Sequence, residues 1–551
     1  MKKSILALGA AAVVGGLGFA GSAHAYAYFG PGTGTNAATM QINPGGVGHE
    51  LFVPYYTAQG NAATLLNIVN TDTINGKVVK VRFRGAANSD DVYDFTLYLS
   101  PGDVWSGKIV QNASTKLANI STIDTSCRVP NDSDNPTPMG GANGDDFKTV
   151  RFGSYFTDDQ KAINTREGYV EILNMADVPP TYISGPNAGK ANALFTATKH
   201  KNGVPPCTVD VIDVVSTITG QFPAGVADAE AAGLAGGTGG LMGGWIIIDQ
   251  TNMAQFSGTS TAITARTLTG AGARANIAVS PQMEGYYGTS DLVTADPLLT
   301  TFVTGNTQFV LPQWFDFPDM STPMVLETIV DNTTTPPTYT LGTNPITPQE
   351  QAVFISNQLG LGKTSTVLNE FLNDPSGGVP MSTDWVVSQP TRRYFAAVYY
   401  SGSAATSDIV YSIQPNIVAY NPYWLGTATG GSGVLSLQKT NVNGPQACLT
   451  GSFSKIYDRE ENTSSARPVT SPTINENRPY CGEVFTLAFG NSPLSAALTK
   501  LQVQGPKAGW AQLGLNHGNA PLPIIGFAAM TGGNQTSGFS VGATWTHRWP
   551  Q

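Results

Sequence analysis

The sequence predicts a mostly β protein with two lobes of antiparallel β-sandwich (Ig-like) domains and a few short helices. Apolar and polar side chains alternate over residues 79–84 and 93–100, as expected for strands, whose successive side chains point to opposite faces. Turn sequences flank these runs, with Asn75-Gly76 before the first and Pro101-Gly102 after the second. A sheet that is apolar on one side needs a second layer, and a sandwich is the simplest solution.

The stretch Leu51–Val110 contains both runs and is the most regular part of the chain. We expect it to form the first wall of the N-terminal lobe, closed by Tyr169–Leu173 and Trp245–Asp249. One face of its first run is charged. That charged row consists of Lys80, Arg82 and Arg84. In an acidic protein such a row predicts an interface with an acidic neighbouring subunit or an anionic envelope polymer, and a solvated strand face is the alternative.

The chain opens with the features of an export signal. Lys2 and Lys3 precede an apolar stretch at residues 5–20, and Ala23-His24-Ala25 has the small residues of a cleavage site. A membrane anchor is the alternative. The expected organisation is a signal peptide at 1–25, an N-terminal arm at 26–48, an N-terminal β-rich lobe at 49–320, and a C-terminal β-rich lobe with short helices at 321–551.

Composition narrows the class of partner. The net charge is −9, and only 12% of the residues are charged. A nucleic-acid partner is disfavoured, because a phosphate backbone requires a basic surface. Low charge with many short polar side chains suits an extracellular β protein.

The chain contains four cysteines, an even number that favours disulfides in an exported protein. Three pairings are possible. Two cysteines fall early and two late, which favours Cys127–Cys207 and Cys448–Cys481.

Three segments are expected to be helical. Thr347-Pro348-Gln349-Glu350 has the cap, the proline and the glutamate of a helix start. A second helical piece is expected over Ser365–Leu372, and an Ala-rich one over Pro223–Leu234.

None of the catalytic motifs in the sequence has the surrounding residues that its chemistry requires. We therefore predict that the protein is not an enzyme, and the sequence identifies no certain cofactor. Ser540 lies in a GxSxG string, but too few residues follow it for the acid and histidine of a hydrolase. Gly360–Thr364 ends like a phosphate-binding loop but lacks the first glycine. The histidines show no metal-ligand spacing.

Two polar clusters stand out in a chain of low charge. An acidic loop could supply oxygen ligands to Ca²⁺, or it could simply be solvated. Its candidate ligands are Asp132, Asp134, Asp145 and Asp146. The dense run Tyr457–Glu461 is expected to form an ion network or a solvated turn. Asp384 and Arg392-Arg393 suggest a similar pairing of arginines with carboxylates.

Several strings together resemble a group of exported proteobacterial proteins described as cell-surface or surface-layer-type proteins. The strings are LLNIVNT, KVVKVRFR and FTLYLSPGDVW within Leu65–Trp105, then Thr165–Glu171, Thr383–Val387 with Pro390-Thr391, and Tyr457–Glu460. The resemblance covers most of the exported chain. It implies a location at the cell surface, on the exterior of the outer membrane, and a structural role, and it supplies no catalytic residues.

The expected function is therefore that of a surface-layer or coat subunit that self-associates through protein–protein contacts. One alternative is a secreted carbohydrate-binding module or adhesin that uses exposed Trp and Tyr side chains. Another is an outer-membrane β-barrel, with Phe539–Trp549 as its closing strand.

Overall fold

The computed structural model describes most residues in 39–129, 156–277, 365–399 and 478–550, with shorter stretches elsewhere. Residues 1–36, 130–142, 278–298, 342–364, 400–408 and 425–434 are among those outside the description. The predicted signal peptide and the predicted helix at Thr347 therefore lie outside the described residues. Strands make up most of the rest, and nearly all pair antiparallel, which confirms the mostly β prediction.

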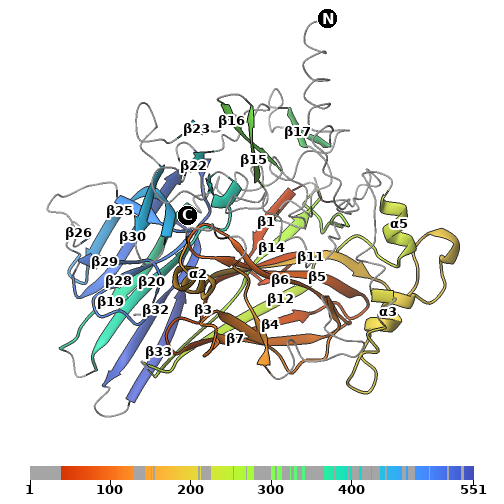
Figure 1. Cartoon of the computed structure of the whole chain (residues 1–551), viewed down its shortest axis with the longest axis horizontal. Helices are drawn as coiled ribbons and strands as arrows, with labels where there is room; N and C mark the ends of the chain where they lie inside the picture. The colour runs from red at the N-terminus through yellow and green to blue at the C-terminus, as the bar shows by residue number, and fades with distance from the viewer. Residues whose placement is uncertain are drawn as a thin grey trace, which may run out of the picture.

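The N-terminal lobe consists of two sheets, drawn from red through yellow-green in Figure 1. Its first sheet has the order β1 (Thr39–Asn43), β14 (Thr261–Arg266), β3 (Glu50–Thr57), β11 (Glu167–Val178), β5 (Gly76–Gly85), β6 (Asp91–Leu99), β9 (Arg128–Val129). Its second sheet has the order β10 (Asp145–Asp146), β8 (Ala118–Ser121), β7 (Val104–Gln111), β4 (Ala62–Asn70), β12 (Leu241–Asp249), β13 (Ala254–Thr259), and β2 (Val47–Gly48) pairs with β12. Phe95 of the first sheet lies 5.4 Å from Trp105 of the second, between ring centroids, so the two sheets share one core.

The stretch Leu51–Val110 forms parts of both layers, which differs from the expected single wall. Strands β3, β5 and β6 lie in the first sheet, whereas β4 and β7 lie in the second. Tyr169–Leu173 does not cover this wall but is hydrogen-bonded into it, between β3 and β5. Trp245–Asp249 lies in the opposite sheet beside β4, as a covering strand should.

The turns around these strands carry the chain from one sheet to the other. Gly102 has a φ of +72°, and the Asp103 N–H donates to the Ser100 carbonyl at 3.1 Å, as the Pro-Gly pair predicts. Asn75-Gly76 makes no hairpin, because β4 and β5 belong to different sheets. Part of the expected N-terminal arm is also ordered into the sheet, since β1 pairs along its whole length with β14.

The C-terminal lobe also has two layers, drawn in cyan and blue in Figure 1. One sheet has the order β19 (Thr366–Leu372), β30 (Ala508–His517), β25 (Gly444–Asp458), β24 (Leu435–Thr440), with β27 (Arg478–Cys481) on β25 and β31 (Ala520–Pro521) on β30. The other has the order β26 (Arg467–Pro468), β29 (Lys500–Gln504), β28 (Val484–Phe489), β20 (Met381–Ser388), β32 (Ile525–Asn534), β33 (Phe539–Thr546). Phe371 stacks on Phe489 between the layers, with 4.6 Å between ring centroids.

Three short β units form separate small sheets. They are β15 (Leu299–Thr304) with β16 (Thr307–Pro312), β17 (Thr328–Asp331) with β18 (Thr338–Leu341), and β21 (Ala396–Tyr399) with β22 (Ile409–Ser412) and β23 (Tyr423–Trp424). The described strands of the first two sheets end at Arg266, and those of the C-terminal sheets begin at Thr366. The predicted division at residues 320–321 falls between them.

The helix predictions had mixed outcomes. Helix α5 (Gly225–Ala231) confirms the Ala-rich prediction. The helix expected over Ser365–Leu372 is wrong, because this segment forms strand β19. Val367, Asn369 and Phe371 are buried and alternate with less buried residues, which is the period of two of a strand. Helix α2 (Asp158–Thr165) was not predicted, although Thr157 and Gln160 form a capping box at its start. The other short helices are η2 (Gly185–Asn187), α3 (Ala193–Thr198) and η5 (Arg392–Tyr394).

Both predicted disulfides are present, Cys127–Cys207 in the first lobe and Cys448–Cys481 between β25 and β27 of the second. Disulfides persist in oxidising compartments, so the chain resides outside the cytoplasm. Across the described residues, no helix has both the length and the apolar character needed to cross a membrane.

The two lobes share apolar and backbone contacts. The Phe527 ring of β32 lies 4.5 Å from Trp245 of β12, measured between ring centroids. The edge strands β13 and β33 also meet, where the Thr544 hydroxyl donates to the Ser257 carbonyl. A Cβ on Gly542 would lie 2.0 Å from the Gln255 carbonyl oxygen, so only glycine permits this approach.

Candidate functional site

The charged row of β5 is buried, which makes the predicted external interface wrong. Lys80 and Arg82 are 2% exposed, and Arg84 is fully buried. Lys80 Nζ lies 3.7 Å from Asp94 Oδ1, and Arg82 Nε lies 3.5 Å from Asp91 Oδ2 on the neighbouring strand β6. The alternation along the strand was read correctly, but both faces are covered. These cations therefore neutralise internal carboxylates and do not face an envelope polymer.

Glu171 is the centre of this buried ion network. Its Oε2 accepts from Arg84 Nε at 3.2 Å and lies 3.7 Å from Arg82 Nη1. Its Oε1 lies 3.4 Å from Arg393 Nε, which comes from η5 of the C-terminal lobe. The prediction that Arg392-Arg393 would meet carboxylates is thus confirmed for Arg393. Three arginines from two lobes converge on one carboxylate, so breaking any pair leaves a buried charge undercompensated.

A loop of the N-terminal lobe extends this contact. The Ser89 hydroxyl donates to Glu483 of the C-terminal lobe and lies 2.8 Å from the Tyr169 hydroxyl. Asn88 Oδ1 accepts from the Ala447 N–H at 3.0 Å. Ser89 has a φ of +58°, an uncommon conformation for a residue other than glycine. The loop holds this conformation where it reaches across to the second lobe.

Two buried carboxyl groups near the lobe contact have raised pKa values. Burial raises the pKa of Glu167 to about 7, although its Oε2 accepts from the Leu498 N–H at 2.6 Å. Burial raises the pKa of Asp384 to about 7 as well, against the hydrogen bonds from Ser492 Oγ at 2.5 Å and Leu494 N–H at 2.8 Å. Both groups are thus poised to change charge near neutral pH.

Tyr55 connects this carboxyl pair electrostatically. Burial and the charges of Glu167 and Asp384 raise its pKa well above the ordinary value. An adjoining cavity of about 30 Å³ is lined by Tyr55, Leu494 and Ala497 among others. That volume suits about one water molecule, so it does not accommodate a substrate.

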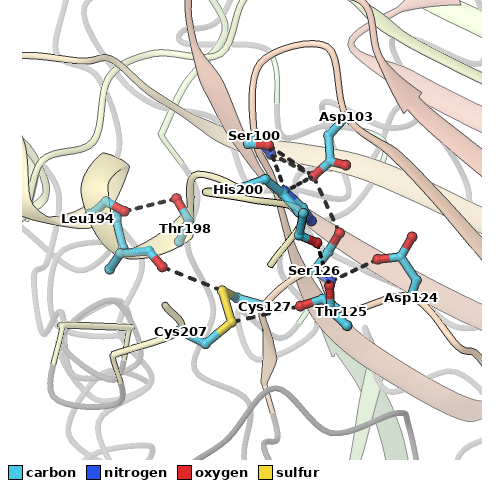
Figure 2. Close-up of a disulfide and its surroundings, with 12 residues drawn as sticks. Ser100, Asp103, Asp124, Thr125, Ser126, Cys127, Leu194, Thr198, His200 and Cys207 are labelled. Carbon is cyan, nitrogen blue, oxygen red and sulfur yellow. Dashed lines mark hydrogen bonds and ion pairs between the residues drawn. A yellow bond between two sulfur atoms is a disulfide. The ribbon is translucent and has the colours of Figure 1, made fainter. Parts of the chain in front are cut away.

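Ser100, His200 and Asp103 form a cluster with the residue types of a hydrolase triad (Figure 2). The Ser100 hydroxyl lies 3.0 Å from His200 Nδ1, and Asp103 Oδ2 lies 3.4 Å from the same nitrogen. A catalytic relay uses the two opposite ring nitrogens, one for the serine and one for the acid. Here the serine and the aspartate both contact Nδ1, so the cluster does not have the geometry of a relay. Asp103 Oδ2 also accepts from Ser126 Oγ at 3.3 Å, beside the disulfide at Cys127. The cluster braces the disulfide region.

Two other histidines are structural. His49 Nδ1 accepts from the Ala265 N–H at 3.2 Å, and its Nε2 lies 3.2 Å from the Ala273 carbonyl. His547 Nε2 lies 2.9 Å from the Val386 carbonyl. Burial lowers the pKa of His49 to about 4 and that of His547 to about 3, so both rings are neutral at pH 7.

Half of the proposed calcium ligands lie in the described residues. Asp145 Oδ2 accepts from the Tyr93 hydroxyl at 2.9 Å. Asp146 accepts from Asn112, Asn119 and Thr115, each at 2.8 Å. Asp132 and Asp134 lie outside the described residues, so the calcium site stays a prediction. In the described part of the chain, no group of three or more His, Cys, Asp or Glu side chains is placed to hold a metal.

The outer face of the second N-terminal sheet carries exposed and half-buried apolar side chains. Val104 is 51% exposed and Met242 is 40% exposed. Val69 lies between them, paired with Val104 on one side and Met242 on the other. Half-buried apolar side chains continue the surface on β4 and β12. We name this surface the outer sheet face, formed by Leu65, Val69, Val104, Met242, Ile246 and Ile248.

Exposed aromatic side chains also occur on the C-terminal lobe. Trp510 is 38% exposed and stacks on Tyr457, with 4.8 Å between ring centroids and 15° between ring planes. A sugar stacks on an aromatic face that is open to solvent. Because these two rings cover each other, each has one face hidden. The pair is therefore a weaker glycan platform than two coplanar rings would be.

The chain matches no family model, no curated protein and no solved structure. The resemblance to surface-layer-type proteins therefore stays a prediction. Sequence reasoning missed Glu167, His200 and the outer sheet face. The sequence did contain a signal for the outer sheet face. Met242, Ile246 and Ile248 are apolar, although they alternate with the buried residues of strand β12 and so occupy positions where polar side chains are expected.

Proposed function

We propose that the protein is a structural subunit of the cell surface that self-associates through the outer sheet face. The observation that carries the proposal is the contiguous apolar row Val104–Val69–Met242 across three strands. Isolated exposed apolar side chains are normal on a soluble protein, but a contiguous apolar patch is typical of an interaction surface. A second copy of the chain is the occupant that a coat subunit requires.

The internal architecture supports the same proposal. A coat subunit must transmit load between its contacts without opening. Here the lobes are joined by a shared apolar core, a buried ion network around Glu171, and edge contacts between β13 and β33. Two disulfides constrain the unfolded chain further.

The test is the oligomeric state of the exported, disulfide-bonded chain. Sedimentation velocity over a concentration series is expected to show dimers or larger species for the wild type. V104D/M242D places two charges on the outer sheet face and is expected to shift the chain to monomer. V379D is the matched control, because Val379 is 50% exposed and lies beside strand β20 of the C-terminal lobe.

Two outcomes would contradict the proposal. One is a wild-type chain that stays monomeric at high concentration, and the other is a V104D/M242D chain that assembles like the wild type. Repeating the series with Ca²⁺ and with a chelator tests the predicted calcium ligands separately. Electron microscopy of the cell envelope then tests whether the assembled form is a surface lattice.

A further inference from the structure

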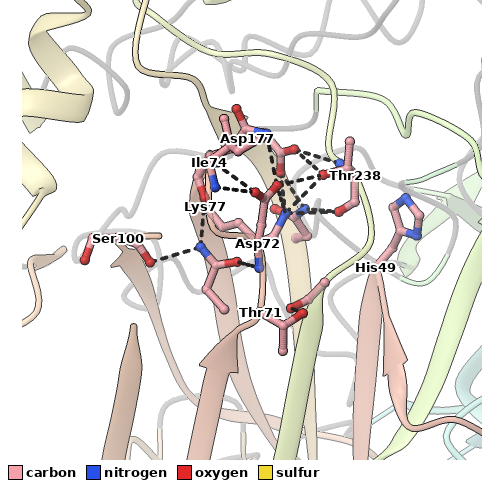
Figure 3. A network of polar contacts seen from close by, with 12 residues as sticks. His49, Thr71, Asp72, Ile74, Lys77, Ser100, Asp177 and Thr238 are labelled. Atoms are coloured by element: carbon pink, nitrogen blue, oxygen red, sulfur yellow. Dashed lines mark hydrogen bonds and ion pairs between the residues drawn. The ribbon is translucent and has the colours of Figure 1, made fainter. Parts of the chain in front are cut away.

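Lys77 is a fully buried lysine at the end of strand β5, directly opposite Asp177 of β11 (Figure 3). Its Nζ lies 2.7 Å from Asp177 Oδ1. The same Nζ donates to the Thr238 carbonyl at 3.2 Å, and Asp72 Oδ2 lies 4.0 Å away. Lysine is almost never fully buried unless it is paired. Two carboxylates and a backbone carbonyl therefore surround this one buried amine.

Asn174 brings an amide to the same place. The register of β11 against β5 shifts between Asn174 and Ala176, so a bulge places Asn174 and Asp177 together around the lysine. Asn174 Nδ2 donates to Asp177 Oδ1 at 3.1 Å and to the Thr238 carbonyl at 3.0 Å. These are the two acceptors that Lys77 Nζ also uses. The amine and the amide nitrogen are therefore neighbours.

Hydrogen bonds from Thr238 fix the orientation of the Asp177 carboxylate. Asp177 Oδ2 is held by the Thr238 N–H at 3.0 Å and by its hydroxyl at 2.5 Å, which leaves Oδ1 shared between the amine and the amide. Asn174 Oδ1 is buried and accepts no hydrogen bond from the residues that the structure describes. A Cβ on Gly237 would lie 2.9 Å from Asn174 Nδ2, so the backbone packs closely over the amide.

We infer that Lys77 and Asn174 form an intramolecular isopeptide bond that cross-links β5 to β11, with Asp177 as the proton carrier. Asp177 Oδ1 takes a proton from the Lys77 ammonium, and the neutral Nζ attacks Asn174 Cγ. The attacking nitrogen then loses a second proton, and the Cγ–Nδ2 bond breaks as Asp177 returns the first proton to Nδ2. The departing ammonia takes up the second proton, so it leaves as ammonium and carries away the lysine charge. One amide replaces another, so no oxidant or reductant is needed.

The fold supplies what this reaction requires. Lys77 and Asn174 are held on the same two acceptors, and reactive groups fixed side by side can reach effective molarities of about 10⁵ M or more, which makes an otherwise slow amide exchange feasible. Asp177 meets both nitrogens, as a group that transfers a proton between them must. The product amide would join two neighbouring strands in the middle of the first sheet. This inference does not depend on the proposed self-association.

The test is mass spectrometry of the wild-type exported chain. Under reducing conditions, its intact mass is expected to be lower than the sequence mass of the processed chain by one ammonia. A tryptic digest is expected to contain a branched peptide that joins the Lys77 and Asn174 segments. K77R is expected to have the full mass, and K116R, a change at an exposed lysine, to keep the wild-type deficit.

Two further variants separate chemistry from folding. N174D keeps an acyl group at the same position and is expected to reach the wild-type product mass by losing water. D177A keeps both reacting groups and is expected to lose the branched peptide while retaining the disulfides. A linear peptide cleaved after Lys77 in the wild type would overturn the inference. So would a branched peptide that joins Lys77 to Asp177 with loss of water.

Discussion

Stability of the lobe contact is expected to depend on pH through Glu167. Burial raises the pKa of this carboxyl from its ordinary 4.5 to about 7 in the folded chain. Between these pH values the folded state keeps the proton that the unfolded state has lost. The unfolded state binds fewer protons there, so stability falls as pH rises from about 4.5 to about 7 and is level above that range.

The magnitude follows from the difference between the two pKa values. Each pKa unit corresponds to about 1.4 kcal/mol, so the Glu167 carboxyl alone contributes a loss of roughly 3 kcal/mol across this range. E167Q removes the titration and keeps an acceptor for the Leu498 N–H. We expect the variant to be less sensitive to pH, and to equal or exceed the wild type at pH 8.

The assay is the urea midpoint of unfolding at intervals from pH 4.5 to pH 8, for wild type and E167Q. E370Q is the matched control, because the Glu370 side chain is 57% exposed. Its curve should follow that of the wild type. Coincident pH curves for wild type and E167Q would refute the reasoning, since they would show that the buried carboxyl does not titrate in this range.

Three other predictions concern stability and can be measured as shifts in the urea midpoint. C127S with C207S is expected to cost roughly 4 kcal/mol, because that disulfide closes a loop of 80 residues, and a loss below 1 kcal/mol would contradict this. R84M is expected to cost about 3–5 kcal/mol because it leaves the central glutamate of the ion network undercompensated, and a neutral or stabilising effect would show that the network does not brace the lobes. G107A is expected to cost about 1–3 kcal/mol, because its methyl group would lie 2.4 Å from a buried indole ring, whereas G272A has open space and should be near neutral.

The disulfides were predictable from sequence because their argument is local. Four cysteines in two well-separated pairs favour one bond per lobe, and the structure contains those bonds. The strands around residues 79–84 and 93–100 were likewise readable from a period of two. Both inferences need only residue types and spacing.

The helix expected at Ser365–Leu372 shows where this reasoning fails. Short apolar segments fit a helix or a strand by pattern alone, and pairing decides between them. Here β30 supplies a partner along the whole segment, from Thr366 opposite Gly514 to Leu372 opposite Ala508. That partner lies more than a hundred residues away in the chain.

The candidate sites depended on tertiary structure still more strongly. Nothing in the sequence places Asn174 and Asp177 around Lys77, because the bulge that does so is a feature of strand pairing. Glu167 reads as an ordinary strand residue until Leu498 of the other lobe donates to it. The outer sheet face required the register of three strands before its apolar side chains became neighbours.

The sequence by itself indicated the β class, favoured the disulfide pairs and showed which side chains share a strand face, because these follow from residue spacing and residue chemistry. Only the tertiary structure decided which faces are covered. Lys80, Arg82 and Arg84 share a face as predicted, yet that face is buried and Arg393 meets the same glutamate there. Burial depends on what packs against a strand, and here Arg393 reaches Glu171 from the other lobe of the chain.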